Sequence, residues 1–144
     1  MNADHYLAAA ERHCQARGCK LTAVRRQVLE LVLRYEGVVK AYQLLADLQK
    51  TRAMAAPPTV YRALDFLVEQ GLLHRVEALN GFIVCRHFEC RHDGLILVCE
   101  ACGRVEEIDA AACLDALRAA SAACGFAVNP QNLVLTGKCK VCPA

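Results

Sequence analysis

The sequence predicts an α+β protein with an N-terminal winged helix-turn-helix domain and a small C-terminal α/β domain. Three observations lead to this prediction. Apolar residues recur at helical spacing through the first half of the chain. The dipeptide Asn80-Gly81, set between two apolar stretches, then indicates a β-hairpin. Beyond the hairpin the pattern changes to short strands and one alanine-rich helix, bordered by pairs of cysteines.

The composition fits a folded protein of one ordinary domain or two small ones, with 144 residues of which 56% are hydrophobic. No apolar run approaches the ~20 residues that a membrane-spanning helix needs. Residues 1–10 contain Asp4 and His5 in place of an apolar signal core, so we expect a cytoplasmic protein without a membrane partner. The net charge of +2 is too small to indicate nucleic-acid binding, although residues 1–78 hold the excess of basic side chains.

The first half predicts four helices, each with a sequence signal at one end. They are expected over residues 4–16, 22–35, 41–50 and 59–70. Thr22 is a typical N-cap for the second helix, and Gly71 is a natural residue to follow the fourth. Two strands, 72–78 and 82–87, are expected around a two-residue turn at Asn80-Gly81. Short helices followed by a hairpin form the outline of a winged helix, in which the fourth helix reads DNA.

The second half predicts a separate small domain. Strands are expected over residues 95–99 and 105–108, a helix over 110–124, and a third strand over 126–135 with a break at Asn129-Pro130. We place the domain boundary within residues 78–83, which gives domains 1–80 and 81–144. Cys113 and Cys124 on the alanine-rich helix are expected to be packed.

Ten cysteines in a chain without an export signal are better explained by metal binding than by disulfides. Cys99-x-x-Cys102 and Cys139-x-x-Cys142 form two knuckles of the kind that complete a tetrahedral, closed zinc site. A redox CxxC pair would need a βαβ context, which the sequence does not offer. We therefore predict a structural zinc ion, bound with folding of the C-terminal domain.

The segment 57–71, PPTVYRALDFLVEQG, resembles the ferric uptake regulator family, and in particular its zinc uptake regulator branch. Leu21-Thr22 with Arg25-Arg26, Ala41-Tyr42 and the two knuckles occur in the order that this family uses. The resemblance covers nearly the whole chain. It implies a homodimeric winged-helix repressor, dimerising through the C-terminal domain, that binds inverted-repeat operators when loaded with metal.

One departure from the family pattern bears on the choice of metal. Iron-sensing members usually carry a histidine-rich run before the first knuckle, whereas residues 90–94 here contain one histidine, His92. Imidazole and carboxylate ligands suit iron or manganese, and thiolate favours zinc. A histidine- and cysteine-rich tail, found in some zinc regulators, does not follow Cys142.

The resemblance also implies a second, reversible zinc site at the hinge, with ligands His74, Cys85, His92 and Glu107. With a two-residue turn at Asn80-Gly81, His74 would face His87, and Cys85 would be a diagonal neighbour of His74 on the same face of the hairpin. The same register makes His87 a rival to His92, and Cys90 is an alternative ligand nearby. Taken singly, Cys85 could equally be a small buried hydrophobic residue and Glu107 a solvated strand residue.

Four residues are candidates for contact with double-stranded DNA: Tyr42, Thr59, Tyr61 and Arg62. If the apolar face of the fourth helix is buried, Tyr61 and Arg62 point outward, and Arg62 is placed to donate two hydrogen bonds to guanine. Tyr42 opens the third helix, where the family also makes a contact. Thr59 and the N-terminus of its helix suit a phosphate.

Together these features predict a zinc-responsive transcriptional repressor that binds operator DNA as a homodimer with two Zn²⁺ per chain. A regulator of the same family that senses iron, manganese or nickel is the related alternative. From another class, a zinc-dependent enzyme would need an open metal position beside a general base, and neither site leaves one. A zinc-ribbon interaction module would leave the winged-helix half without a role. We expect no enzymatic activity and no small-molecule substrate.

Overall fold

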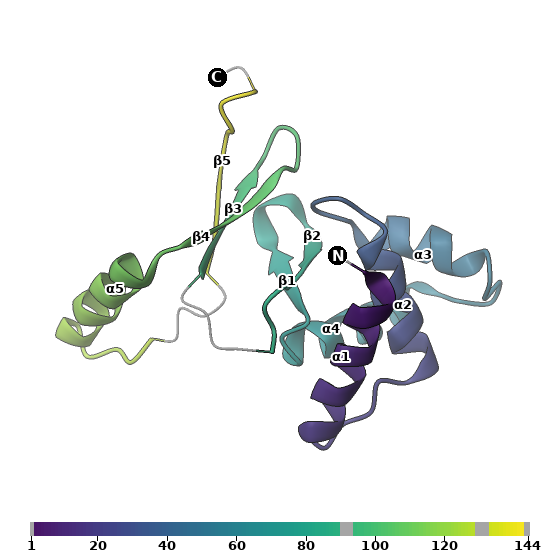
Figure 1. Cartoon of the computed structure of the whole chain (residues 1–144). Helices are drawn as coiled ribbons and strands as arrows, with labels where there is room; N and C mark the ends of the chain where they lie inside the picture. The colour runs from purple at the N-terminus through teal and green to yellow at the C-terminus, as the bar shows by residue number, and fades with distance from the viewer. Residues whose placement is uncertain (1, 90–93, 129–132, 143–144) are drawn as a thin grey trace. The chain divides into compact units, whose positions relative to one another are not determined.

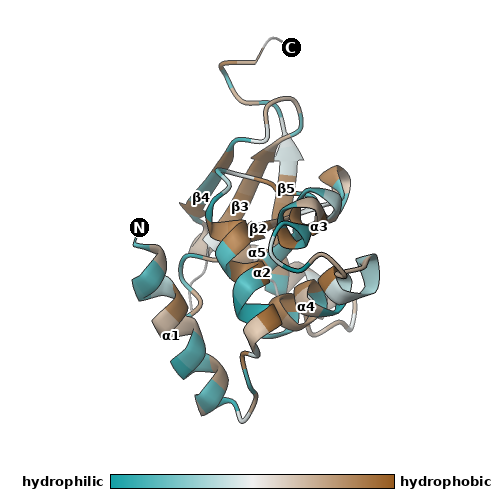
Figure 2. Ribbon diagram, turned by 90° about the vertical axis from the view of Figure 1, so that its right-hand side faces the viewer, coloured by the Kyte–Doolittle hydropathy of each residue, from teal (hydrophilic) through white to brown (hydrophobic). Residues whose placement is uncertain are grey.

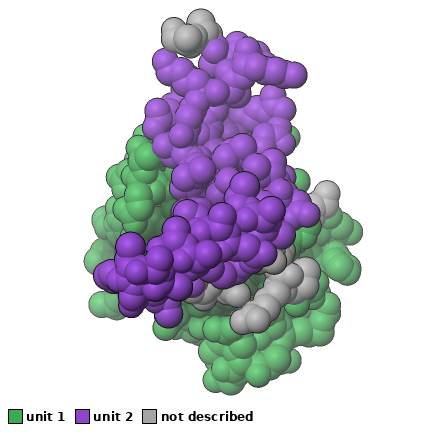
Figure 3. Space-filling view, turned by 90° about the vertical axis from the view of Figure 1, so that its left-hand side faces the viewer, with its two compact units in different colours: residues 1–89 green, residues 90–144 purple. Residues whose placement is uncertain are grey.

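The computed structural model describes residues 2–89, 94–128 and 133–142, and the chain divides into two compact units, residues 1–89 and 90–144 (Figure 3). The division falls later than the expected boundary between residues 80 and 81. The reason is that both strands of the hairpin belong to unit 1: they pair with each other, and Leu72, Leu73 and Phe82 are buried in the core that the helices form.

Unit 1 begins with four helices, each starting within two residues of its predicted position (Figure 1). They are α1 (Ala3–Ala16), α2 (Ala23–Leu33), α3 (Ala41–Gln49) and α4 (Pro57–Glu69). The side chain of Thr22 caps α2 by accepting a hydrogen bond from the backbone N–H of Arg25 at 3.4 Å. Helix α4 starts at Pro57. Proline is well suited to the first turn of a helix, because the N–H groups of that turn have no partner within the helix and the missing N–H of proline costs nothing there.

The apolar stripes of these helices meet in one continuous core, and Figure 2 shows the corresponding brown bands alternating with teal along α1 and α4. Val28, Leu44, Leu64 and Leu67 have no exposed surface. The buried residues of α4 include the predicted Val60, Leu64 and Leu67, while Val68 is half-buried. The core therefore fixes which side of α4 remains outside.

The wing hairpin consists of β1 (Leu73–Val76) and β2 (Gly81–Val84), but its turn differs from the prediction. Val76 pairs with Gly81, so residues 77–80 form the turn, with a 3-10 helix η1 at Glu77–Leu79. Asn80 adopts the left-handed conformation with φ of 48°. Gly81 instead opens β2 where a Cβ would lie 2.4 Å from Val38 Cγ1, because the backbone of Phe82 pairs with that of Val39.

Unit 2 contains a three-stranded sheet and one helix. Its elements are β3 (Gly94–Cys99), β4 (Val105–Asp109), α5 (Ala111–Ala123) and β5 (Val134–Gly137). The strand order is β4-β3-β5, with β4 antiparallel and β5 parallel to β3. Leu95, Ala110 and Leu114 form its small buried cluster.

Two expectations for unit 2 were wrong. The last strand begins at Val134 rather than at residue 126, and residues 126–128 form no strand. The expected break at Asn129-Pro130 lies outside the described residues. Cys113 and Cys124 are exposed rather than packed, because α5 buries a single residue, Leu114. No helix in the described part of the chain is long and apolar enough to cross a membrane.

Candidate metal centre and DNA-binding surface

The two cysteine knuckles are held at one end of the sheet of unit 2. Cys99 is the last residue of β3, and Cys102 follows in the turn toward β4. This turn is closed by a hydrogen bond from Gly103 N–H to Cys99 O at 2.8 Å, and Gly103 adopts a positive φ of 74°. Cys139 follows β5, which pairs with β3, so the parallel pairing brings the second knuckle to the first.

The four sulfur atoms have the spacing of a tetrahedral metal site. Sγ–Sγ distances are 3.8 Å for Cys99 to Cys142, 3.8 Å for Cys102 to Cys139, and 3.6 Å for Cys139 to Cys142. All four ligand atoms lie within 4.8 Å of one another. With Zn–S bonds of ~2.3 Å, a regular tetrahedron places its sulfurs about 3.8 Å apart. The geometry therefore fits a single zinc ion.

Hydrogen bonds prepare part of this cluster for binding a cation. The backbone N–H of Cys139 lies 3.4 Å from Cys99 Sγ, and with that of Cys102 it lowers the pKa of the Cys99 thiol to about 6. The pKa of Cys142 is raised to about 12, first by its hydrogen bond with the side chain of Cys139. Neighbouring thiolates repel one another, and a divalent cation removes that repulsion.

The donor set distinguishes a closed structural site from a catalytic one. Four sulfur ligands complete the coordination of zinc and leave no position for a substrate. The residues present thus fit zinc, and the predicted Cys₄ set comes together as a group.

The hairpin places two of the proposed sensing ligands on one face. His74 pairs with Ile83 in the sheet, and the alternation of side chains puts Cys85, two residues further, on the same face. Both side chains are buried, His74 at 4% exposure and Cys85 at 3%. Imidazole nitrogen and thiolate sulfur are both zinc ligands, so this shared face is compatible with the predicted site.

The predicted register of the hairpin was wrong. His74 faces Ile83 and not His87, because the turn spans residues 77–80. Since the true register differs from the predicted one by an even number of residues, His74 and Cys85 remain diagonal neighbours. His87 loses the register argument that made it a rival ligand, and its side chain is exposed.

The other two proposed ligands belong to unit 2. Glu107 is exposed on β4, where it pairs with Ile96. His92 and the alternative ligand Cys90 lie outside the described residues. The complete set of four sensing ligands therefore stays a prediction.

Helix α4 presents the expected outer face. Tyr61, Arg62 and Asp65 are exposed, with Tyr61 at 52%. Within the described part of the chain Arg62 takes part in no ion pair. Asp65 binds Arg75 of β1 through an N–O contact of 2.8 Å, which offsets an acidic charge on the surface predicted to meet DNA.

Tyr42 and Tyr61 line a common cavity of about 180 Å³ between the start of α3, helix α4 and the wing turn. Both rings are largely exposed, Tyr42 at 67%. Lys40 and Arg75 also line this cavity. The acidic Glu77 lines it as well, so the structure brings two predicted DNA contacts that are far apart in sequence to one surface of mixed charge.

The expected phosphate contact at the start of α4 needs a correction. Pro57 and Pro58 have no N–H, and the N–H of Thr59 already donates to Ala56 O at 3.0 Å. The backbone of the first turn therefore does not offer the anion site that an ordinary helix N-terminus provides. Any contact from Thr59 would be made by its hydroxyl group.

Two residues with evident structural roles near these surfaces were not identified from the sequence. Arg75 joins the wing to α4 through Asp65 and lies with its guanidinium carbon 5.3 Å from the centroid of the Phe82 ring. Tyr6 donates a hydrogen bond to Cys85 O at 2.7 Å. Tyr6 and Cys85 are separated by 79 positions, so no local sequence signal indicated this contact.

Comparison with known proteins places these features in a family. Residues 16–136 match the model of the ferric uptake regulator family. The zinc uptake regulation protein of Escherichia coli (strain K12) is 39% identical over 137 residues, which are 94% of this chain and 80% of that protein. The ferric uptake regulation protein of Cupriavidus metallidurans is 31% identical over 126 residues, 85% of each chain.

Solved structures agree with these matches. A zinc uptake regulator complexed with zinc and DNA superimposes with a TM-score of 0.88 at 38% identity, over 99% of this chain and 95% of that one. Holo XcZur gives a TM-score of 0.80 at 39% identity, over 96% of each chain. The α+β fold class predicted from the sequence is confirmed.

Proposed function

The chain belongs to the ferric uptake regulator family, and we propose that it is a zinc-responsive transcriptional repressor. In this proposal the zinc-loaded homodimer binds double-stranded operator DNA and controls zinc uptake genes. The protein acts in the cytoplasm, where that DNA lies, and it is a regulator rather than an enzyme.

The observation that carries the choice of zinc is that His74 and Cys85 are both buried and lie on the same face of the hairpin. A thiolate ligand favours zinc over iron or manganese, which prefer oxygen and imidazole ligands. The relatives at 38–39% identity that are named for the metal they regulate or bind are zinc uptake regulators, which supports the same choice.

We assign two zinc ions to each chain. One is held by the Cys₄ group of unit 2, whose sulfur spacing fits a tetrahedral site. The other is bound reversibly by His74, Cys85, His92 and Glu107. The second ion supplies a centre whose ligands come from both units, so that binding selects one arrangement of the DNA-reading helices.

The exposed apolar residues of unit 2 support the homodimer. Phe126 is 69% exposed, Leu135 47%, Leu117 44% and Ile108 42%. Exposed apolar side chains in such number are typical of a surface that a second subunit covers. In the dimer two copies of α4 would meet two halves of an inverted repeat.

A titration of DNA binding tests the proposal. The anisotropy of a labelled palindromic, AT-rich duplex would be followed in metal-buffered solutions, with free Zn²⁺ and Fe²⁺ varied separately. We expect zinc alone to switch on salt-sensitive binding that a scrambled duplex does not show. Arg62→Ala should weaken it about 10- to 100-fold, the range for loss of a two-bond contact with guanine.

Arg34→Ala is the matched control for this experiment. Arg34 is an exposed arginine of the same unit at the C-cap of α2, where it pairs with Glu30, and it is not among the predicted DNA contacts. Its loss should leave the affinity unchanged. Equal activation by Fe²⁺ would assign the protein to the iron-sensing alternative, and equal binding of the scrambled duplex would contradict an operator-specific repressor.

A further inference from the structure

Tyr6 of helix α1 is a buried residue whose hydroxyl group reaches the wing hairpin. Its side chain is 4% exposed. The hydroxyl donates to Cys85 O at 2.7 Å and also lies 3.1 Å from Leu72 O. One O–H group thus contacts the backbone on both sides of the open end of the hairpin.

The two residues whose carbonyl groups Tyr6 contacts are also hydrogen-bonded to each other through their backbones. The N–H of Cys85 donates to Leu72 O at 2.9 Å, so residues 72 and 85 form the last hydrogen-bonded pair beyond β1 and β2. Cys85 follows β2 directly, and His74 lies two residues after Leu72. The Tyr6 hydroxyl therefore fixes the part of the hairpin that carries both proposed sensing ligands.

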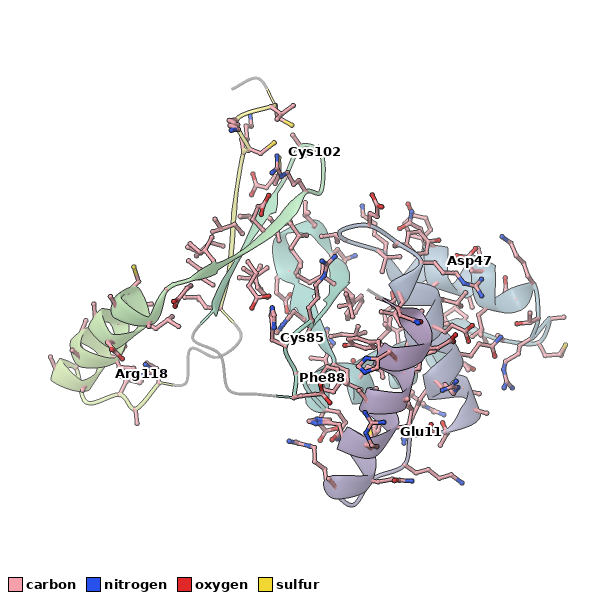
Figure 4. All side chains as sticks on the ribbon, in the orientation of Figure 1. Glu11, Asp47, Cys85, Phe88, Cys102 and Arg118 are labelled. Atoms are coloured by element: carbon pink, nitrogen blue, oxygen red, sulfur yellow. The ribbon has the colours of Figure 1, made fainter. Side chains whose placement is uncertain are left out.

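Other contacts hold α1 against the same region. The Tyr6 ring meets Phe88 edge-on with a centroid separation of 5.0 Å, and the His13 ring also meets Phe88 edge-on, at 5.2 Å. His13 Nε2 also lies 2.9 Å from Gln70 O at the end of α4. Figure 4 labels Cys85 and Phe88 where the chain leaves β2 and runs beside α1.

We propose that Tyr6 is a positioning residue for the sensing site, holding the backbone of Cys85 so that its thiolate stays directed at the metal. This inference rests on the proposed function in one respect, the assignment of Cys85 as a zinc ligand. Groups that orient a metal ligand commonly change the metal affinity about 10- to 100-fold when removed. Through Tyr6, the N-terminal helix α1 would thus contribute to the zinc affinity of the sensing site.

The test compares Tyr6→Phe with Tyr35→Phe in the full-length protein. Tyr6→Phe keeps the ring and its contact with Phe88 but removes the hydroxyl. Tyr35→Phe removes a tyrosine hydrogen bond of the same unit, that to Asp47 Oδ2 at 2.5 Å, away from the ligands. If zinc binding differs between the two variants, the cause is therefore the location of the lost hydrogen bond near Cys85 and not a general loss of stability.

Two readouts are needed. The affinity of the second Zn²⁺ is measured by competition with a chromophoric chelator, and Co²⁺ bound at that site reports the thiolate through its charge-transfer absorption. We expect Tyr6→Phe to weaken the second zinc about tenfold and to shift or weaken the thiolate band. Tyr35→Phe should change neither.

Cys85→Ser separates failure of this inference from failure of the proposed function. If Cys85→Ser leaves the second zinc and the thiolate band intact, the assignment of the sensing site is wrong. If Cys85→Ser removes both while Tyr6→Phe behaves like the wild type, the sensing site stands and the positioning role of Tyr6 is overturned. An equal effect of Tyr6→Phe and Tyr35→Phe would also overturn it.

Discussion

At the scale of single residues, Tyr35 and Asp47 show how one hydrogen bond ties the segment that follows α2 to helix α3. The Tyr35 hydroxyl donates to Asp47 Oδ2 at 2.5 Å, and Lys50 Nζ lies 3.1 Å from Asp47 Oδ1. These bonds, first that from Tyr35, lower the pKa of the Asp47 carboxyl from its ordinary value of 3.8. A lowered pKa means that the folded state favours the carboxylate, so the contribution is present above pH ~4 and is lost as the pH falls through the folded value.

Tyr35→Phe tests this contact. At neutral pH we expect a loss of about 1 kcal/mol in the free energy of unfolding, toward the low end for a charged acceptor because Asp47 is partly exposed. The difference from the wild type should shrink as the pH is lowered below about 4, where the unfolded carboxyl is protonated. Urea unfolding at several pH values measures both effects, and a difference that grows on acidification would contradict the assignment.

At the scale of the element, the two residues of the Asn80-Gly81 dipeptide have different roles in the wing turn. Asn80 supplies the left-handed backbone, whereas Gly81 supplies space. A side chain at position 81 would meet Val38 Cγ1 at 2.4 Å and Val39 O at 3.0 Å, where the backbone of residue 39 bridges to β2. The dipeptide indicates a hairpin correctly, yet the need for glycine at position 81 comes from the backbone bridge between Val39 and Phe82, which local sequence does not reveal.

Substitution of the two residues should therefore have different effects on stability. Gly81→Ala is expected to destabilise unit 1 by about 1–3 kcal/mol, the usual cost of forcing extra atoms into a packed region. Asn80→Gly should be neutral or slightly stabilising, because glycine adopts a positive φ more easily. Thermal unfolding checks both. A Gly81→Ala variant as stable as the wild type would show that the wing does not approach Val38 so closely.

At the scale of the whole molecule, the two units are stabilised by different means. Unit 1 has a continuous apolar core that draws on all four of its helices and on the hairpin. Among its described residues, unit 2 buries few large apolar side chains, which are Leu95, Ile96, Val98 and Leu114, and this core is small for an independent fold. The Cys₄ group, which clamps β3 to the chain after β5, would supply the missing stability when zinc is bound.

The sequence was informative where the chemistry is local. The start of α2 followed from its N-cap Thr22. The Cys₄ ligands followed from two short spacings that each place two sulfurs at one ion. The register of the hairpin, the later unit boundary and the role of Tyr6 depend on partners many residues away, which periodicity does not encode. The family resemblance supplied the four sensing ligands. His74 and Cys85 share a buried face of the hairpin, and the role of all four as ligands stays a prediction.

The central claim is that one zinc holds the fold while another controls DNA binding, and a single comparison tests it most directly. Zinc content by native mass spectrometry and zinc-dependent operator binding would be measured on the wild type, Cys85→Ser and Cys139→Ser, with Cys113→Ser as an exposed-cysteine control. We predict that Cys85→Ser keeps one zinc per chain and a folded unit 2 but no longer responds to added zinc. Cys139→Ser should lose the ordered sheet of unit 2, and Cys113→Ser should match the wild type. A Cys85→Ser protein that binds two zinc ions and still switches would contradict the claim.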